Sequence, residues 1–502
     1  MNADSLAKSD YLGHHYSDSE LVIGLVAATG TDLGRISDII GERLSAFNYT
    51  AETIRISKEV IPGMFELRAT PSDHFASIQE LMDLGNEARQ KTGDYSILAL
   101  AVAAHIHSKR RGNGETDQPQ PFPRKAFIVR SLKHPEEVKR LREIYSHGFF
   151  CIGVHEEKDR RRSHLVEEKR VREDDADKLI SRDKEEEADY GQHTSDAFHQ
   201  SDFFLQVTEN EDRNKKSVWR ALDIIFGSPY ITPNFDEYAM FMAFSSALRS
   251  ADLSRQVGAV VARDEQILST GANDVPRYGG GLYWPEYKSD ISEYADHEGG
   301  RDYKRGQDSN KSEKEKIIKD IVESVSVGGE KELEDALRKS QINELTEYGR
   351  AVHAEMEALL ACGRSGISTR GATLYCTTFP CHNCAKHIVA SGIKRVVFVE
   401  PYPKSKAIEF HDDSIELGFS RASEKVVFEP FVGVGPRSFF SLFSVSLGSG
   451  YRVRRKDSEG AVVEWEREAS KLRMQLLPCS YLEREMVATK FVEEYLERLE
   501  NE

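Results

Sequence analysis

Two short stretches of this 502-residue chain carry side chains that suit metal binding and proton transfer. They read HAE at 353–355 and PCHNC at 380–384. His353, Cys381 and Cys384 offer one imidazole and two thiolates, a set that suits a tetrahedral zinc ion with its fourth position open to water. An open position of this kind is typical of a catalytic zinc site. Glu355 stands two residues from His353, so we expect its carboxylate to move protons beside the metal rather than to bind it.

Both stretches fall where the sequence predicts the start of a helix. The free N–H groups and the positive dipole end there favour a thiolate over a thiol, and Pro380 suits the first turn because its missing N–H costs nothing there. Zinc-activated water and a carboxylate proton carrier together can add hydroxide to an amidine-like ring carbon and protonate the departing ammonia. His-x-Glu followed by Pro-Cys-x-x-Cys is the signature of zinc-dependent nucleobase deaminases. The spacing therefore predicts a hydrolytic deaminase centre.

Two other interpretations of the cysteines stay open. Cys381 and Cys384 form a C-x-x-C pair, which also occurs in redox proteins. A closed structural zinc site would use Cys362 or Cys376 as the fourth ligand, and it would leave Glu355 without a role. Six cysteines in the whole chain are too few for a disulfide framework, so a reducing compartment is expected in either case.

The elements that must position these residues follow the order helix–strand–strand–helix–strand–helix–strand. A helix is expected at 237–251, and residues 256–274 predict a hairpin that turns at 263–266. A polar stretch at 278–343 then interrupts the pattern, as a lid, an interface arm or a partly disordered segment would. We place this domain at 235–430.

Residues 431–502 are expected to form a C-terminal extension. Its last helix carries apolar residues at a four-residue spacing, at Val487, Phe491, Tyr495 and Leu499. Such a stripe predicts that the helix docks on the first domain or on a neighbouring subunit.

The first domain is expected at 19–228, after an N-terminal extension at 1–18. Residues 20–30 predict a short apolar strand and a glycine turn, and residues 31–47 have the apolar spacing of a helix. Further strands alternate with helices and are expected at 125–132, 149–155 and 201–210. This alternation is typical of a parallel sheet covered by helices. The fold class is therefore α/β, with a parallel N-terminal sheet followed by a second α/β/α domain.

A strand, a glycine turn and a helix also open nucleotide-binding α/β folds. A working phosphate loop follows the pattern G-x-x-x-x-G-K-[ST]. Here the spacing from Gly24 to Gly30 is one residue too long, and Thr31 and Asp32 stand where the lysine and the hydroxyl residue belong. Without the lysine the γ-phosphate charge is poorly neutralised, so we expect a degenerate loop with poor phosphate transfer. A regulatory domain that senses a nucleotide or a partner, a structural remnant and a working NTP hydrolase all stay open.

Composition narrows the class of protein further. The formal net charge is −16, and an acidic surface disfavours the phosphate backbone of long nucleic acids. The longest apolar stretch, Ile97–Ile106, has about half of the length that a membrane-spanning helix needs. The first 20 residues have neither the basic start nor the apolar core of a secretory signal. We therefore expect a cytoplasmic protein that does not contact a membrane.

The second domain resembles deoxycytidylate deaminases of the cytidine deaminase superfamily over residues 241–410. The shared motifs are SADLSRQVGAVV (250–261), the GAN step (271–273), VHAEMEAL (352–359) and TTFPCHNCAKHIVASGI (377–393). The resemblance implies that Asn273 meets the sugar 3′-hydroxyl and that Thr378 and Phe379 line the base pocket. It also implies a mixed five-stranded sheet flanked by helices, and a homo-oligomer.

Two further substrate contacts are expected from position in the chain. Ala354 begins the HAE helix, where a free backbone N–H can support the carbonyl of the base. Lys404 follows the last core strand, in a loop that could reach the mouth of the site, where its ammonium group would meet a phosphate.

Over its full length the chain looks like the two-domain bacterial anti-phage deoxycytidine nucleotide deaminases. Stretches shared outside the motifs above are IGLVAATGTDL (23–33), VRSLKHPEEVKRLREIY (129–145), ADYGQ (188–192) and EPYPKSKA (400–407). The resemblance implies a P-loop kinase-like domain joined to a deaminase domain that converts dCTP or dCMP to dUTP or dUMP and ammonia. It implies zinc as the cofactor, dCTP depletion as antiviral defence, and a homo-oligomer such as a hexamer. A nucleotide effector and an inhibitory small RNA are further partners that it suggests.

Three alternatives stay beside this hypothesis. A nucleic-acid deaminase that acts on tRNA or single-stranded DNA uses the same chemistry, but it needs a basic channel lined with aromatic side chains. A housekeeping dCMP deaminase would feed dTTP synthesis. A regulatory binding protein would keep the zinc site covered by the polar insertion until a partner arrives.

Overall fold

A computed structural model gives the fold of the chain. It describes residues 18–65, 74–111, 120–185, 191–325, 330–340, 342, 345, 347–402, 405–419, 424–446, 450, 452–475 and 478–501. The chain forms two compact units, unit 1 from Met1–Pro233 with Val432–Glu502 and unit 2 from Asn234–Phe431. Nearly all of the segment expected as a separate C-terminal extension is therefore part of unit 1. Among the described residues, every helix is too short or too polar to span a bilayer.

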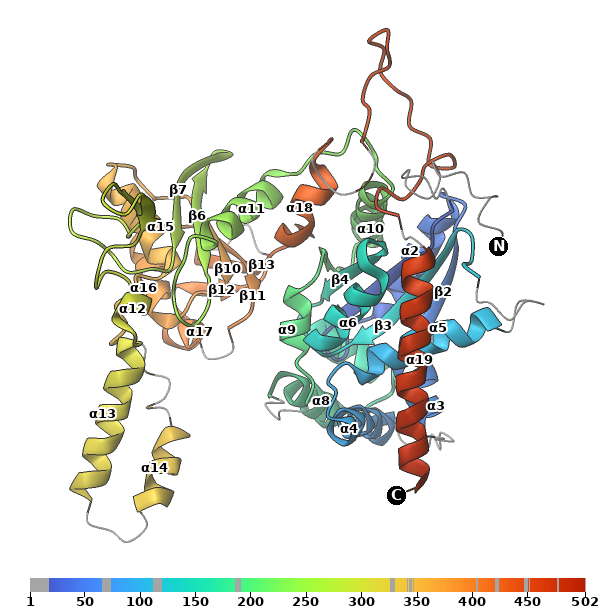
Figure 1. Ribbon diagram of the computed structural model, residues 1–502, viewed down its shortest axis with the longest axis horizontal. Coiled ribbons are helices and arrows are strands. Elements are labelled where there is room, and N and C mark those ends of the chain that lie inside the picture. The colour runs from blue at the N-terminus through green and yellow to red at the C-terminus, as the bar shows by residue number, and fades with distance from the viewer. Residues whose placement is uncertain are drawn as a thin grey trace. The chain divides into compact units, whose positions relative to one another are not determined.

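Unit 1 is built on a six-stranded sheet, with the order β14-β5-β4-β1-β3-β2 in the described part of the chain (Figure 1). Its strands are β1 (Leu21–Ala27), β2 (Thr50–Arg55), β3 (Lys125–Leu132), β4 (Phe149–His155), β5 (Phe203–Gln206) and β14 (Gly433–Val434). All of them run parallel except the short β14, which pairs antiparallel with β5. The predicted strands at 125–132 and 149–155 are confirmed as β3 and β4. Their nearly continuous apolar sequence follows from burial on both faces of a parallel sheet.

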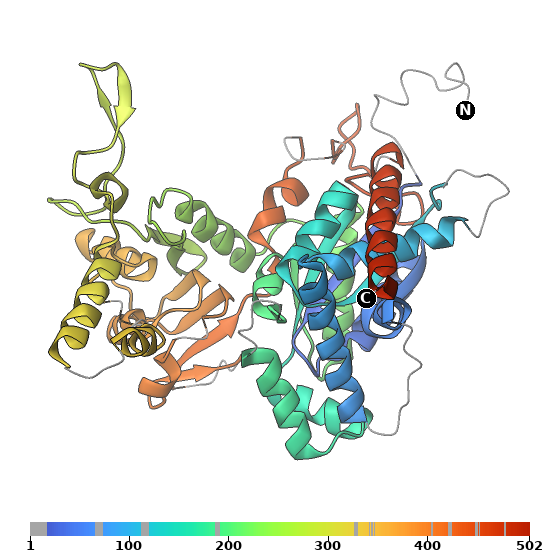
Figure 2. The same cartoon turned by 60° about the horizontal axis from the view of Figure 1, so that its bottom comes forward.

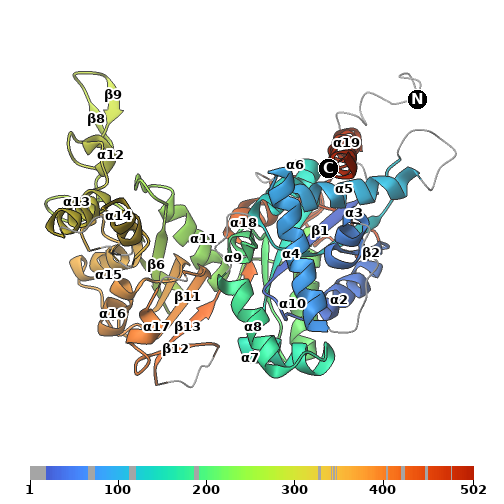
Figure 3. The ribbon, with the colours of Figure 1, turned by 90° about the horizontal axis from the view of Figure 1, so that it is seen from below.

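Helices cover both faces of this sheet (Figure 3). The helices of unit 1 are α2 (Leu33–Ser45), α3 (Ile61–Phe65), α4 (His74–Thr92), α5 (Ile97–Arg111), α6 (Pro135–Tyr145), α7 (Lys158–Ser163), α8 (Glu173–Glu185), α9 (Thr194–His199), α10 (Glu211–Ile225), α18 (Pro436–Phe443) and α19 (Pro478–Asn501). On β1, Val22 and Val26 pack with α5, α6 and α19. The alternate residues Ile23 and Leu25 pack with α2 and α10 on the other face, because successive side chains of a strand point to opposite sides.

Helix α19 packs against α5 through a different face from the predicted one (Figure 1). Tyr481, Ala488, Val492 and Tyr495 are buried in the core of unit 1. Val487 and Phe491, which the four-residue spacing selected, are 52% and 59% exposed. The prediction of docking on the first domain is right. The predicted stripe is wrong at Val487 and Phe491 and right at Tyr495, and the side chain of Leu499 lies outside the described residues. With the buried Glu485 between Tyr481 and Ala488, the buried residues alternate steps of four and three, because a helix turns once every 3.6 residues.

A buried ion cluster ties α19 to the start of β1. The guanidinium of Arg110 contacts Glu20 at 2.7 Å and both carboxylate oxygens of Glu485, at 2.7 and 3.0 Å. The hydroxyl of Tyr481 donates a further hydrogen bond to Glu20. All of these groups are buried. A buried charge is tolerated only when partners satisfy it, so each member of the cluster depends on the others.

Unit 2 contains a second six-stranded sheet, with the order β12-β13-β11-β10-β6-β7 in its described residues. Its strands are β6 (Gly258–Arg263), β7 (Gln266–Ala272), β10 (Thr373–Thr378), β11 (Arg395–Glu400), β12 (Ile415–Leu417) and β13 (Val426–Pro430). The predicted hairpin is confirmed, since β6 and β7 pair antiparallel and turn at Asp264 and Glu265. The sheet is mixed, as the resemblance implied, but it has six strands rather than five. The additional strand is the three-residue β12 at the edge, which is too short to give a periodic signal.

The helices of unit 2 pack closely on this sheet. They are α11 (Phe235–Ala247), α12 (Asp302–Arg305), α13 (Ser309–Ser324), α14 (Glu330–Arg338), α15 (Ala354–Arg364), α16 (His382–Ala390) and α17 (Ala407–Phe410). Leu374 and Cys376 of β10 pack in a core with α15 and α16. A Cβ atom on Gly271 of β7 would lie 2.1 Å from the carbonyl oxygen of Ala354. Glycine at this position therefore lets the first turn of α15 rest directly on the strand.

The polar segment predicted at 278–343 is a folded part of unit 2 in its described residues. It contains α12, α13 and α14 together with a hairpin of β8 (Glu286–Lys288) and β9 (Glu293–Ala295), which projects from the rest of unit 2 (Figure 2). Arg338 of α14 forms ion pairs with Glu315 of α13 and with Glu334. Arg301, just before α12, is 5% exposed.

The ion cluster predicts a large effect on stability. Arg110→Met keeps the aliphatic stem but leaves two buried carboxylates without their cation, so the free energy of unfolding of unit 1 should fall by about 3–5 kcal/mol. Urea denaturation of the full chain, followed by circular dichroism, measures this loss. Lys490→Met on the exposed face of α19 is the matched control and should change stability little. Equal losses in the two variants would contradict the role of the cluster.

Candidate active site

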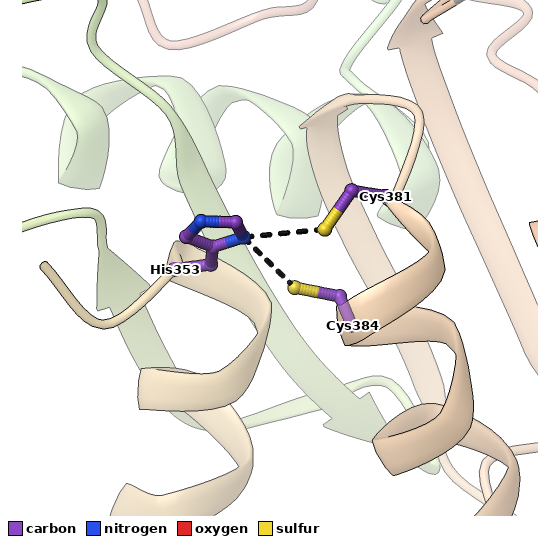
Figure 4. A group of neighbouring side chains, drawn as sticks. All are labelled: His353, Cys381 and Cys384. Carbon is purple, nitrogen blue, oxygen red and sulfur yellow. Dashed lines mark hydrogen bonds between the residues drawn. The ribbon is translucent and has the colours of Figure 1, made fainter. Parts of the chain in front are cut away.

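His353, Cys381 and Cys384 come together in unit 2 (Figure 4). The Nδ1 atom of His353 lies 3.3 Å from the Sγ atom of each cysteine. The three ligand atoms all lie within 4.8 Å of one another, and both cysteines are buried. This is the arrangement that the sequence predicted for a metal centre.

Two helix starts position these three side chains. His353 is the N-cap of α15 and Cys381 is the N-cap of α16, both with extended backbone angles. Cys384 lies one turn further along α16 and therefore faces the same point. Pro380 precedes the N-cap, so the prediction that it lies in the first turn is wrong. The helix begins two residues later, at His382, because Cys381 takes the cap position.

The surroundings of Cys381 favour its thiolate form. Hydrogen bonds to Cys384 and to His353 hold the pKa of Cys381 at about 4. The contact with Cys381 in turn raises the pKa of His353 to about 9. A thiolate is the form of cysteine that binds a metal ion.

The donor set fits zinc. One imidazole nitrogen and two sulfurs at a shared point are three ligands of a tetrahedral zinc ion. Among the described residues, neither Cys362 nor Cys376 belongs to the group, so no fourth protein ligand closes it. Cys362 instead contacts the Ser269 hydroxyl at 3.1 Å. The arrangement therefore favours an open site over the closed structural site.

Glu355 is buried next to this group, with 4% of its surface exposed. Burial, and after it the charge of Cys381, raises the pKa of Glu355. The thiol of Cys376 on β10 donates a hydrogen bond to its carboxylate. A held carboxyl group with a raised pKa is suited to accepting and returning a proton at neutral pH.

A cavity of about 250 Å³ opens above the His/Cys/Cys group. His353, Ala354 and Glu355 line it, together with Thr378 and Phe379. Ala354 is the first residue of α15, so its N–H has no intrahelical acceptor. The ring of Phe379 packs against Phe398 and Phe428, at 4.9 and 5.5 Å between ring centroids. The predicted base-pocket residues therefore share one cavity with the predicted ligands.

Asn273 also lines the cavity, at the end of β7. Its Oδ1 atom accepts from the N–H of Val257 at 2.7 Å, and its Nδ2 group donates to the carbonyl of Arg255 at 2.8 Å. Each side-chain group of asparagine can make one more hydrogen bond. Asn273 is thus held rigidly while it keeps capacity for a ligand. Lys404, the remaining predicted contact, lies outside the described residues.

The sequence did not single out several charged and aromatic residues of the cavity. Arg255 stacks on Tyr402, with its guanidinium 4.9 Å from the ring centroid, and is 44% exposed. Its guanidinium also forms an ion pair with Glu400, at 3.7 Å. Arg350, which follows the insertion, and Asp302, which lies within it, also line the cavity. The position of Arg255 inside the motif SADLSRQVGAVV was a usable signal, whereas nothing local marks Asp302 as a cavity residue.

The residues of the predicted degenerate phosphate loop lie partly in β1 and partly in the loop after it, in unit 1. Gly24 lies inside β1, where a Cβ atom would collide with side chains of both neighbouring strands. Gly30 has a φ of +91°, a conformation that side chains rarely allow. Thr31 follows it, and Asp32 caps α2 by accepting from the N–H of Arg35 at 3.1 Å. The loop itself therefore begins only after Ala27.

Carboxylates of unit 1 occupy the N–H groups of this loop. Asp183 of α8 accepts from the N–H of Thr29 at 2.8 Å, and Glu156 accepts from the N–H of Asp32 at 3.0 Å. Both carboxylates are buried. Lys133 donates to Asp183 at 2.9 Å, so this cation is paired within the protein. Groups that could bind an anion are thus used by the protein itself.

Comparison with known proteins places these observations in a family context. A family model described as the cytidine and deoxycytidylate deaminase zinc-binding region matches residues 233–400. The deoxycytidylate deaminase of Enterobacteria phage T4 is 33% identical over 167 residues, which cover 33% of this chain and 77% of that protein. The deoxycytidylate deaminase of Mycobacterium phage D29 is 33% identical over 173 residues, which cover 34% of this chain and 96% of that protein.

A solved structure also aligns with part of the chain. The dCMP deaminase of cyanophage S-TIM5 in apo form is 18% identical, with a TM-score of 0.23, over 40% of this chain and 100% of that chain. This low TM-score leaves the sequence comparisons as the basis for assigning a family.

The geometry of the His/Cys/Cys group predicts which cysteine is needed for zinc binding. The purified protein should contain about one zinc ion per chain, and Cys381→Ser should lose most of it because a hydroxyl binds zinc more weakly than a thiolate does. Elemental analysis of the purified variants measures this. Cys362→Ser is the matched control, since Cys362 is equally buried but lies outside the ligand group. Equal zinc content in the two variants would contradict the assignment.

Proposed function

The chain belongs to the family of cytidine and deoxycytidylate deaminases. We propose that unit 2 removes the 4-amino group of a deoxycytidine nucleotide by hydrolysis. The reaction consumes water and converts dCMP or dCTP to dUMP or dUTP and ammonia. The observation that carries the proposal is the His/Cys/Cys group at the floor of a cavity, with a buried carboxylate beside it.

Different residues of the site bind the metal ion and transfer protons in this proposal. His353, Cys381 and Cys384 hold zinc, which when bound supplies Lewis-acid activation of water. The Glu355 carboxylate takes a proton from the attacking water and gives it to the ring nitrogen. Glu355 then moves the hydroxyl proton of the added water to the 4-amino group, so that the C4–N bond breaks, the carbonyl forms and ammonia leaves.

Other cavity residues hold the substrate. The Ala354 N–H donates to the base carbonyl, and Thr378 and Phe379 bound the base. The side chain of Asn273 forms a hydrogen bond with the sugar hydroxyl, for which it has capacity left. Arg255, whose guanidinium lies 3.7 Å from the Glu400 carboxylate and is 44% exposed, offers its remaining N–H donors to the phosphates, since a planar fork of donors matches phosphate oxygens. Lys404 is a second phosphate contact in this proposal.

Free nucleotides are favoured over nucleic acid as substrates. Asp252, Asp302 and Asp308 line the cavity beside its two arginines. Carboxylates at the mouth disfavour the flanking phosphates of a polynucleotide, which needs a continuous basic channel.

The resemblance over the whole chain supports a wider proposal about the role of the reaction. The protein depletes dCTP during phage infection. It acts as a homo-oligomer whose activity is regulated by a nucleotide effector or by a small inhibitory RNA. The alternative is a housekeeping role, in which dCMP is the substrate and its product feeds dTTP synthesis. Preference for dCTP over dCMP separates the two.

Product analysis with a substrate panel tests the reaction. The panel contains cytidine, CMP, CTP, deoxycytidine, dCMP, dCTP and a cytosine-containing single strand. We expect conversion of dCMP or dCTP, and a loss of about 10²–10⁴-fold in kcat for Glu355→Gln, because that variant binds the nucleotide but cannot carry the proton. Glu357→Gln on the same helix is the matched control for the substitution. Full activity of Glu355→Gln, or activity on the single strand alone, would overturn the proposal.

We also propose that unit 1 is a degenerate P-loop kinase-like domain with a regulatory role. The support is a parallel sheet with β1 between β3 and β4 and a loop that leads from β1 to α2, which is how nucleotide-binding α/β folds are arranged. The missing lysine and the carboxylates on the loop argue against phosphate transfer.

Phosphate release tests that role. With ATP, GTP or dCTP, the full chain should release no inorganic phosphate above the buffer level, because Asp183 and Glu156 occupy the loop and no lysine follows Gly30. Addition of a nucleotide should instead alter the rate of deamination. A steady release of phosphate by the wild type would contradict a purely regulatory domain.

A further inference from the structure

Arg301 connects the polar insertion to the core of unit 2. Its Nε atom lies 3.3 Å from Asp274, its Nη1 atom lies 3.3 Å from Asp296, and its Nη2 atom donates to the carbonyl of Tyr283 at 2.6 Å. Arg301 is 5% exposed and Asp274 is 2% exposed. Burial of charged groups gives little net stability, so the cluster needs another reason than stability.

Asp274 links two residues of the site through the backbone. It follows Asn273 directly in the chain. Its backbone exchanges two hydrogen bonds with Val352, at 3.2 and 2.9 Å, and Val352 precedes His353. One residue therefore sets the spacing between the asparagine of the cavity and the histidine of the metal group. Arg301 faces the carboxylate of that residue.

The residue after Arg301 lies at the cavity itself. Asp302 lines it and accepts from Arg350 at 2.6 Å. The carbonyl of Gly300 accepts from the same guanidinium at 3.0 Å. Arg350 lines the cavity three residues before His353. The turn at 300–302 thus holds a cavity arginine on one side and Asp274 on the other.

We propose that Arg301 is a positioning residue through which the insertion sets the width of the substrate cavity. It acts on one wall through Asp274, the neighbour of Asn273, and on another wall through Asp302, the partner of Arg350. The insertion is then part of the binding site rather than a removable cover. This inference rests on the proposed deaminase function of unit 2.

The test separates positioning from stability. Arg301→Gln removes the guanidinium that lies 3.3 Å from the buried Asp274 carboxylate and leaves Arg249 as a remaining cation near it. The variant is therefore compared with the double variant Asp274→Asn/Arg301→Gln, in which both charges of this pair are absent. A glutamine side chain is too short to reach all three acceptors. Arg338→Gln is the matched control, an exposed arginine of the same insertion whose ion pairs lie on α13 and α14.

Kinetics with dCMP and dCTP are measured for each variant, together with the melting temperature and the zinc content. For the double variant we expect wild-type zinc content, an unchanged kcat and a KM that rises about tenfold to a hundredfold, since small misplacements of binding groups have effects of this size. Arg338→Gln should keep the wild-type KM. An unchanged KM in the double variant, or a loss confined to kcat, would overturn the inference. A wild type that converts no nucleotide would instead overturn the proposed function.

Discussion

The site of unit 2 depends on how closely α15 approaches β7. Gly271 has no side chain, and a single added carbon would lie 2.1 Å from the carbonyl oxygen of Ala354. This close approach brings the start of α15, and with it His353, beside the strand end that carries Asn273. The α16 start arrives from the other direction at the end of β10. The His/Cys/Cys group and the predicted base pocket both include the start of α15. Both therefore depend on this contact between the backbones of α15 and β7.

Both units use helix starts to hold negative charge. In unit 2 Cys381 caps α16 beside the start of α15, and the hydrogen bonds at Cys381 favour its thiolate form. In unit 1 the loop before α2 receives carboxylates from Asp183 and Glu156. The physical principle is the same, since free N–H groups and the helix dipole favour an anion. The difference lies in the anion, which is the thiolate of a predicted metal ligand in unit 2 and a pair of carboxylates in unit 1.

Local patterns explain which parts of the fold and the site could be predicted. The grouped residues His353, Cys381 and Cys384, and Glu355 beside them, lie within two short motifs, and β3 and β4 are nearly continuous apolar runs. Neighbours in the sequence were therefore sufficient to predict that the three side chains come together and that the two strands form. The buried face of α19 was missed because a spacing of four residues drifts around a helix that turns every 3.6. Asp302 and Arg350 could not be assigned to the cavity from sequence. Their positions depend on the path of the insertion, which contacts between distant residues determine.

The ion cluster of unit 1 has a consequence for the order in which the protein folds during synthesis. Arg110 and its partner Glu485 are separated by 375 positions. At ~5–20 residues per second, a ribosome needs ~20–75 s to make that stretch. All of unit 2, Asn234–Phe431, emerges within this interval. The deaminase unit is thus free to fold while the sheet of unit 1 still lacks β14 and its covering helix α19, and the nascent chain carries a finished site before its first domain is closed.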